Sequence, residues 1–216
     1  MSEGAPLEWV IFDLGGVMVR LAGSWSKACE LAGVAPPASI DDPALMAELL
    51  PLVDQSERGQ LDQAGFCRGV ADAAGMRVED VHDVTTAWLV EPYPGLDGLI
   101  DRLHAAGLKT ACLSNTNAHH WSIMTGEGNA ASLPLGRLHR RFASHVVGAR
   151  KPEASIYAHV EAELGAAPGA LMFFDDNLPN VEAALARGWR SVRVDPHADP
   201  AAQVREAVQA ALGPLG

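Results

Sequence analysis

The chain has 216 residues, enough for one large domain or for a core with a modest insert. Hydrophobic residues make up 48% and charged residues 20%, a globular composition that leaves little room for long disorder. The formal net charge is -11 and no run of lysine and arginine offsets it, so we expect no nucleic-acid partner. An anionic substrate remains compatible with this charge, because a local pocket can be positive on an acidic protein.

The sequence carries no signal for export or membrane insertion. Residues 1–7 lack the basic start and apolar stretch of a signal peptide, and no apolar run approaches the roughly 20 residues of a membrane helix. Three widely spaced cysteines, Cys29, Cys67 and Cys112, fit reduced thiols. We therefore expect a cytoplasmic protein with no membrane partner, present as a monomer or a weak homodimer.

Short apolar segments predict the strands of a parallel sheet that is buried on both faces. In chain order they are Trp9–Phe12, Lys109–Leu113, Ser144–Val147, Ala170–Phe174 and Arg190–Val194. Apolar residues at helical spacing lie between and after them, at 96–103, 156–164, 181–187 and 201–212. Because strand and helix alternate, the sequence predicts an α/β fold.

The alternation fails between Val19 and about Pro92, where we predict helices and no strand. The best helical candidates are 45–53, 63–74 and 78–90, separated by residues typical of turns. An all-helical block placed after the first strand is expected to cover the sheet. We expect residues 1–18 and 93–216 to form the core and residues 19–92 to form this insert.

Polar residues follow four of the predicted strands, at the sheet edge where open α/β folds bind ligands. In chain order they are Asp13, then Ser114 and Asn115, then Lys151, then Asp175 and Asp176. Three carboxylates at one edge would repel one another, so we predict a bound Mg²⁺, which prefers carboxylate oxygens and can clamp phosphate. Lys151 would balance the remaining charge, and Ser114 and Asn115 could donate hydrogen bonds to phosphate oxygens.

Four segments resemble, in order, the motifs of the haloacid dehalogenase (HAD) superfamily. They are Phe12-Asp13-Leu14-Gly15-Gly16-Val17, Leu113-Ser114-Asn115-Thr116-Asn117, Gly148-Ala149-Arg150-Lys151-Pro152 and Phe174-Asp175-Asp176-Asn177. The helical insert lies where that superfamily has its C1 cap. The resemblance implies a Rossmann-like core with an α-helical cap that closes over a small phosphorylated metabolite.

The resemblance also implies a role for each motif residue. Asp13 would attack phosphorus and form an aspartyl-phosphate. Asp13, the backbone carbonyl of Gly15, and Asp176 would hold Mg²⁺, with Asp175 bound directly or through water. Ser114 and Lys151 would bind the phosphate and stabilise the transition state, with Asn115 lining the same pocket.

Gly15 departs from the pattern of HAD phosphatases, most of which carry there a second Asp that acts as general acid and base. Loss of such a group costs roughly 10²–10⁴ in rate, which falls hardest on poor leaving groups. The Asp-Leu-Gly and Ser-Asn-Thr-Asn sequences, with Glu57-Arg58-Gly59-Gln60-Leu61, resemble a subgroup that includes bacterial α-glucose-1-phosphate phosphatase. The substrate hypothesis is therefore a sugar 1-phosphate.

Two other functions stay open on the sequence. A 2-haloacid dehalogenase uses the same Asp13 on carbon without Mg²⁺, although the Asp175-Asp176 pair counts against it. A HAD-like binding or regulatory module would keep the phosphate pocket without turnover, and Gly15 alone favours it. Outside the motifs, Arg58 is equally compatible with a substrate contact and with a surface role. For His119 and His120 we expect structural or surface roles.

Overall fold

The computed structural model describes residues 5–126 and 131–213 and contains a five-stranded parallel sheet in the order β5-β4-β1-β6-β7. The strands are β1 (Trp9–Phe12), β4 (Lys109–Ser114), β5 (Arg140–Ala143), β6 (Leu171–Asp175) and β7 (Arg190–Arg193). Phe12, at the end of the central strand, pairs with Cys112 on one side and Phe174 on the other, so the three central strands end together. The predicted α/β fold is confirmed.

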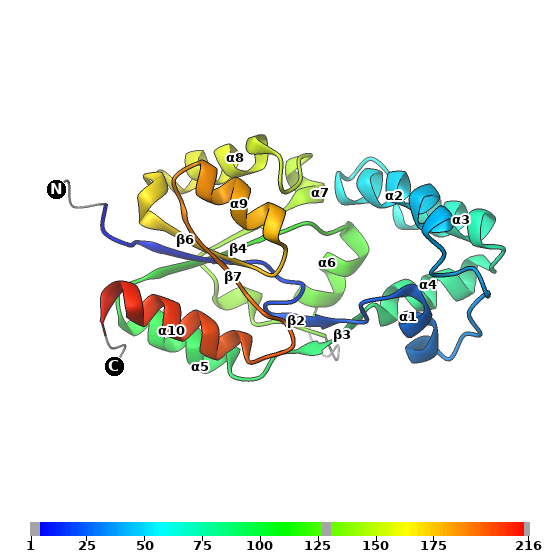
Figure 1. Ribbon diagram of the computed structural model, residues 1–216, viewed down its shortest axis with the longest axis horizontal. Coiled ribbons are helices and arrows are strands. Elements are labelled where there is room, and N and C mark those ends of the chain that lie inside the picture. Colours follow the sequence, from blue (N-terminus) through cyan, green and yellow to red (C-terminus); the bar gives the residue numbers. More distant parts are fainter. Residues whose placement is uncertain (1–4, 127–130, 214–216) are drawn as a thin grey trace.

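Helices cover both faces of this sheet (Figure 1). One face packs against α5 (Leu96–Ala105) and α10 (Pro200–Leu212), and the other against α8 (Ala154–Leu164) and α9 (Leu178–Ala186). Val10 and Phe12 belong to the first core and Trp9 and Ile11 to the second, since successive side chains of a strand point to opposite faces. This double burial explains why the central strands are continuous apolar runs.

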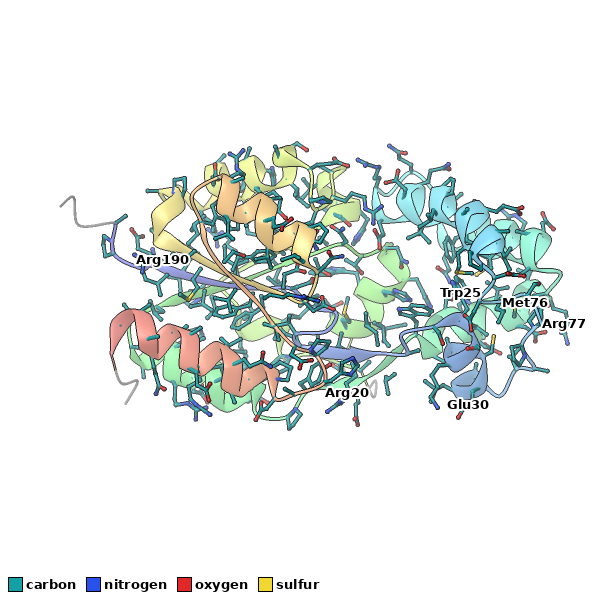
Figure 2. The ribbon with its side chains drawn as sticks, in the orientation of Figure 1. Arg20, Trp25, Glu30, Met76, Arg77 and Arg190 are labelled. Atoms are coloured by element: carbon teal, nitrogen blue, oxygen red, sulfur yellow. The ribbon has the colours of Figure 1, made fainter. Side chains whose placement is uncertain are left out.

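Four helices form a separate group at one end of the molecule, the helical insert (Figure 1). They are α1 (Trp25–Ala32), α2 (Pro43–Glu57), α3 (Gln63–Ala74) and α4 (Val78–Ala87). Ser24 and Asp62 cap α1 and α3 by accepting a backbone N–H. The insert has its own apolar core, which includes Trp25, Phe66 and Val84. Figure 2 shows the side chains of this group, with Trp25 labelled.

The prediction of no strand between Val19 and Pro92 was wrong. The antiparallel strands β2 (Val19–Leu21) and β3 (Leu89–Pro92) carry the chain from the core into the insert and back. Arg20, labelled in Figure 2, lies on this ribbon. Strands of three and four residues are too short to show the alternation on which a sequence-based prediction depends.

The predicted strand at Ser144–Val147 was also wrong, because these residues form the short helix α7. The strand is β5, which lies at the sheet edge and begins with the exposed Arg140 and Arg141. The Ser144 hydroxyl accepts the Thr116 N–H at 2.9 Å and donates to the Thr116 carbonyl at 3.0 Å, which fixes α7 beside the end of β4. Lys151 therefore follows a helix rather than a strand.

The remaining elements are α6 (Ala118–Thr125) and the short 3-10 turns η1 (Leu135–Arg137) and η2 (Pro168–Ala170). Cys29, Cys67 and Cys112 are buried free thiols. Across residues 5–126 and 131–213, every helix is too short or too polar to cross a bilayer.

Candidate active site

The carboxyl ends of the three central strands bring the acidic motif residues together. Asp13 follows β1, Asp175 is the last residue of β6, and Asp176 comes next. One carboxylate oxygen from each of the three lies within 4.8 Å of the others. Ser114 ends the neighbouring strand β4 and is almost fully buried. The predicted gathering of these residues at one sheet edge is confirmed.

Lys151 is buried between two of the acids. Its Nζ lies 2.9 Å from Asp13 Oδ1 and 2.6 Å from Asp175 Oδ2, and its side chain is 1% exposed. Asn115 holds the lysine backbone on both sides, donating from Nδ2 to the Lys151 carbonyl and accepting the Lys151 N–H, each at 2.8 Å. Because Asn115 already uses both ends of its amide in this way, the structure makes it a positioning residue for Lys151. Its predicted phosphate contact stays a prediction.

Asp175 is fully buried and surrounded by donors. Asn180 donates to both of its oxygens, at 3.1 and 3.0 Å, and the Asn177 N–H donates to Oδ1 at 2.8 Å. Tyr157 donates its hydroxyl proton to the Asn180 carbonyl at 2.9 Å. Asp175 thus anchors Lys151, whereas the half-buried Asp176 is more open to an added ligand.

The electrostatics of this cluster show an excess of negative charge. Burial raises the pKa of Asp13, and the charges of Asp175 and Asp176 raise it further, although Lys151 opposes them. Burial and Asp175 also raise the pKa of Asp176. Burial lowers the pKa of Lys151, but the two carboxylates outweigh burial, so its net pKa lies above the ordinary lysine value. Three carboxylates against one ammonium leave a net negative charge, and carboxylate oxygens are the ligands that a hard divalent cation prefers.

Two glycines shape the turn after Asp13. Gly16 has a φ of 72°, and a Cβ placed there would lie 2.5 Å from Asp176 Oδ2, so a side chain at this position would push the carboxylate aside. Gly15 has no such constraint, since its Cβ would meet only the end of the Leu21 side chain, at 2.9 Å from Cδ1. The predicted metal contact of the Gly15 carbonyl stays a prediction.

A pocket of about 210 Å³ lies between the strand ends and the helical insert. Its wall is largely apolar and includes Trp25, Phe66 and Trp88 from the insert and its connection to the core. Polar side chains of the core complete it, among them Ser114 and Asn115. His120 also lines the pocket, and its Nε2 lies 2.8 Å from the Thr85 carbonyl, a contact that agrees with the predicted structural role. Its place after the second motif was the only signal in the sequence.

Ion pairs join the insert to the segment that carries Lys151. Arg58 contacts Glu153 of the core and lies 2.9 Å from Asp54 at the end of α2. Arg150, directly before the catalytic lysine candidate, reaches back to Asp54 at 3.1 Å and to Glu57 at 2.5 Å. Arg58 is therefore neither a free surface residue nor directed at the pocket, and sequence reasoning missed the part that Arg150 and Glu57 play.

Comparison with known proteins agrees with this geometry. Residues 7–188 match the family model of the haloacid dehalogenase-like hydrolases. Acyl-CoA dehydrogenase family member 10 of Mus musculus is 26% identical over 223 residues, which cover 98% of this chain but only 20% of that protein. This chain thus spans about a fifth of that relative. It belongs to the haloacid dehalogenase-like hydrolase family, and it is an enzyme of the hydrolase class.

Solved structures share the fold. The HAD family enzyme bt-2542 of Bacteroides thetaiotaomicron has a TM-score of 0.77 at 22% identity, covering 90% of this chain and 97% of that one. The L-2-haloacid dehalogenase of Xanthobacter autotrophicus has a TM-score of 0.64 at 21% identity, covering 94% and 83%. At such identities these likenesses show the fold.

Proposed function

We propose that this protein is a Mg²⁺-dependent phosphomonoester hydrolase that works through an aspartyl-phosphate on Asp13. The observation that carries the proposal is the close group of Asp13, Asp175 and Asp176 with the buried Lys151. Asp13 and Asp176, with the Gly15 carbonyl, would hold Mg²⁺. When bound, the ion supplies a Lewis acid that neutralises phosphate oxygens. The bt-2542 enzyme has been crystallised with magnesium and inorganic phosphate, which supports this choice.

The residues of the chain itself divide the work of the reaction. An oxygen of the Asp13 carboxylate attacks phosphorus and the bond to the leaving oxygen breaks; water then attacks the aspartyl-phosphate and releases phosphate. Lys151 is fixed beside the Asp13 carboxylate at 2.9 Å, where its charge favours the ionised nucleophile and the negative transition state. Ser114 lines the same pocket, and its hydroxyl group would donate to a phosphate oxygen.

The substrate we propose is a sugar 1-phosphate, enclosed by the helical insert acting as a cap. Gly15 leaves the position of the usual acid empty, and an anomeric oxygen leaves more easily than a simple alkoxide. The pocket wall supports a sugar-sized leaving group: Trp25 and Trp88 present rings whose centroids lie 5.6 Å apart, and Ser56 and Thr85 add hydroxyl groups. Small-molecule sites commonly combine such an apolar wall with a few polar groups.

A second candidate, 2-haloacid dehalogenase, is favoured by one observation, the apolar wall of the pocket. That reaction needs no acid at Gly15, and a dehalogenase is among the structural neighbours. The acidic pair argues against it. Burial and the charge of Asp175 raise the pKa of Asp176, and the two cations that act on it, Lys151 and Arg193, do not offset the rise. A metal-free reaction would leave this cost unrelieved.

Steady-state hydrolysis with and without Mg²⁺ tests the proposal, using 4-nitrophenyl phosphate, glucose 1-phosphate and glucose 6-phosphate. We expect Mg²⁺-dependent turnover that Asp13→Asn abolishes, with the 1-phosphate ahead of the 6-phosphate. Turnover without that preference would refute the sugar 1-phosphate. Halide release from 2-chloropropionate without Mg²⁺ would favour the dehalogenase. Phosphate binding with neither activity would indicate a binding module.

A further inference from the structure

The missing acid at Gly15 leaves the leaving oxygen without an obvious proton source. Among the described residues that line the pocket, Glu57 is the one with a carboxyl group, and His120 is the one with an imidazole. His120 is poorly suited to donate a proton, because its Nε2 lies 2.8 Å from the Thr85 carbonyl and burial lowers its pKa. Glu57 is therefore the better proton donor of the two.

Glu57 is built into the pocket wall rather than into the solvent-exposed surface. It is the last residue of α2, its side chain is 18% exposed, and it lines the same pocket as Gly15 and Ser114. Arg150 Nη2 lies 2.5 Å from Glu57 Oε2, and the contact lacks the angles of a directed hydrogen bond. Because Arg150 directly precedes Lys151 in the chain, this ion pair connects Glu57 to the segment that carries the buried lysine.

From these positions we propose that Glu57 takes the place of the absent acid–base group, an inference that rests on the proposed phosphatase function. The Glu57 carboxyl group gives its proton to the leaving oxygen as the phosphorus–oxygen bond breaks and the Asp13–phosphorus bond forms. The resulting carboxylate then accepts a proton from water as the water oxygen attacks phosphorus and the Asp13–phosphorus bond breaks. The cycle returns Asp13 and protonated Glu57.

The surroundings of Glu57 fit a group that must hold and release a proton. Burial, the largest influence, raises its pKa, and the charge of Asp54 adds to the rise. Arg150, Lys151 and Arg58 oppose it, but the net pKa still lies above that of an ordinary glutamate. A larger share of Glu57 is then protonated near neutral pH than of an exposed glutamate, which is what a general acid requires.

The test compares Glu57→Gln with the parent enzyme on 4-nitrophenyl phosphate, phenyl phosphate and glucose 1-phosphate, with Mg²⁺ present. We expect kcat to fall by about 10²–10⁴-fold on phenyl phosphate and much less on the nitrophenyl ester, whose leaving group needs no proton. The parent should lose kcat at high pH as Glu57 ionises, and the variant should lack that limb. Glu153→Gln, which removes the other acid that joins the insert to the core, should affect all esters equally.

A rescue sharpens the test. Gly15→Asp places a carboxyl group in the space bounded by the end of Leu21, and in the Glu57→Gln background it should restore hydrolysis of phenyl phosphate. An equal loss on every ester with an unchanged pH profile would overturn the inference and leave Glu57 a structural partner of Arg150. In that case parent turnover would still support the phosphatase. Absence of Mg²⁺-dependent turnover in the parent would instead refute the proposed function, and this inference with it.

Discussion

Replacing Gly16 by alanine should weaken metal binding far more than the same change at Gly15, although the two residues are adjacent. Gly16 has a φ of 72°, and an added Cβ would lie 2.5 Å from Asp176 Oδ2 and 2.6 Å from its Cγ. At Gly15 the added Cβ would meet only Leu21, at 2.9 Å from Cδ1, the end of a flexible side chain. The pair of variants thus separates displacement of Asp176 from any general effect of filling the turn.

The size of the effect follows from two contributions. A left-handed backbone costs an alanine roughly 1–2 kcal/mol, and for a chain of this length each kcal/mol lowers the melting temperature by about 2–4 °C. Carbon atoms pack at about 3.5–4.0 Å, so the Asp176 carboxylate must move by about 1 Å. Loss of correct positioning around a metal typically costs about 10–100-fold in affinity. We therefore expect Gly16→Ala to lower the Mg²⁺ affinity by about 100-fold.

The assay is a Mg²⁺ titration read in two ways, by the rise in melting temperature and by turnover of 4-nitrophenyl phosphate. Gly15→Ala keeps its backbone carbonyl and should bind Mg²⁺ almost as the parent does. Gly16→Ala should need much more Mg²⁺ for the same rise and the same rate. Equal Mg²⁺ dependence of the two variants would refute the reasoning, because it would show that Asp176 does not contribute to the metal site.

Three further predictions concern residues around the site. Lys151→Met leaves two buried carboxylates facing each other and should cost about 3–5 kcal/mol in urea denaturation without Mg²⁺, part of which Mg²⁺ restores; an unchanged midpoint would contradict the ion pairs. Asn115→Ala removes both hydrogen bonds to the Lys151 backbone and should cost about 1–3 kcal/mol while lowering kcat, whereas full activity would exclude a positioning role. Burial, with the charges of His120 and His82, lowers the pKa of His119 to about 4, below its value in the unfolded chain. Protonation of His119 therefore favours the unfolded state, and the stability of the protein should fall as the pH drops from 6.5 to 4. Thermal melts across this pH range should show a smaller fall for His119→Gln.

The ends of the strands that bear the acidic site residues were predictable, because the apolar pattern of the sequence matches the burial of these strands. β1 and β6 are buried on both faces, so their residues form uninterrupted apolar runs, and the acids after them mark the points where the strands end. The parallel topology then brings Asp13 and Asp175 together without further information. For Asp13 and Asp175, the apolar run in the local sequence and the parallel pairing of the buried strands therefore lead to the same predicted position.

The third motif was harder to place because its position is set by tertiary contacts. β5 is an edge strand that begins with two exposed arginines, so it lacks an apolar run, whereas Ser144–Val147 looks like a strand and forms a helix. Lys151 is held in place by the Asn115 amide, and α7, which precedes it in the chain, is fixed by the Ser144 hydroxyl against Thr116 just after β4. Contacts between residues so distant in sequence leave no periodic signal, and the ion pair of Glu57 with Arg150 is hidden for the same reason.

The charge balance of the site supports the proposed phosphatase over the dehalogenase. Lys151 touches Asp13 and Asp175 but not Asp176, so one ammonium faces three carboxylates. Asp175 is satisfied by Lys151 and by the amide of Asn180, whereas Asp13 and Asp176 keep a raised pKa, caused first by burial and then by the charges of the neighbouring carboxylates. A divalent cation between these two would remove the repulsion and attract a phosphate, while attack on carbon gains nothing from a second acid. The cost of holding Asp176 beside the other acids therefore supports the proposed metal-dependent phosphatase over the dehalogenase.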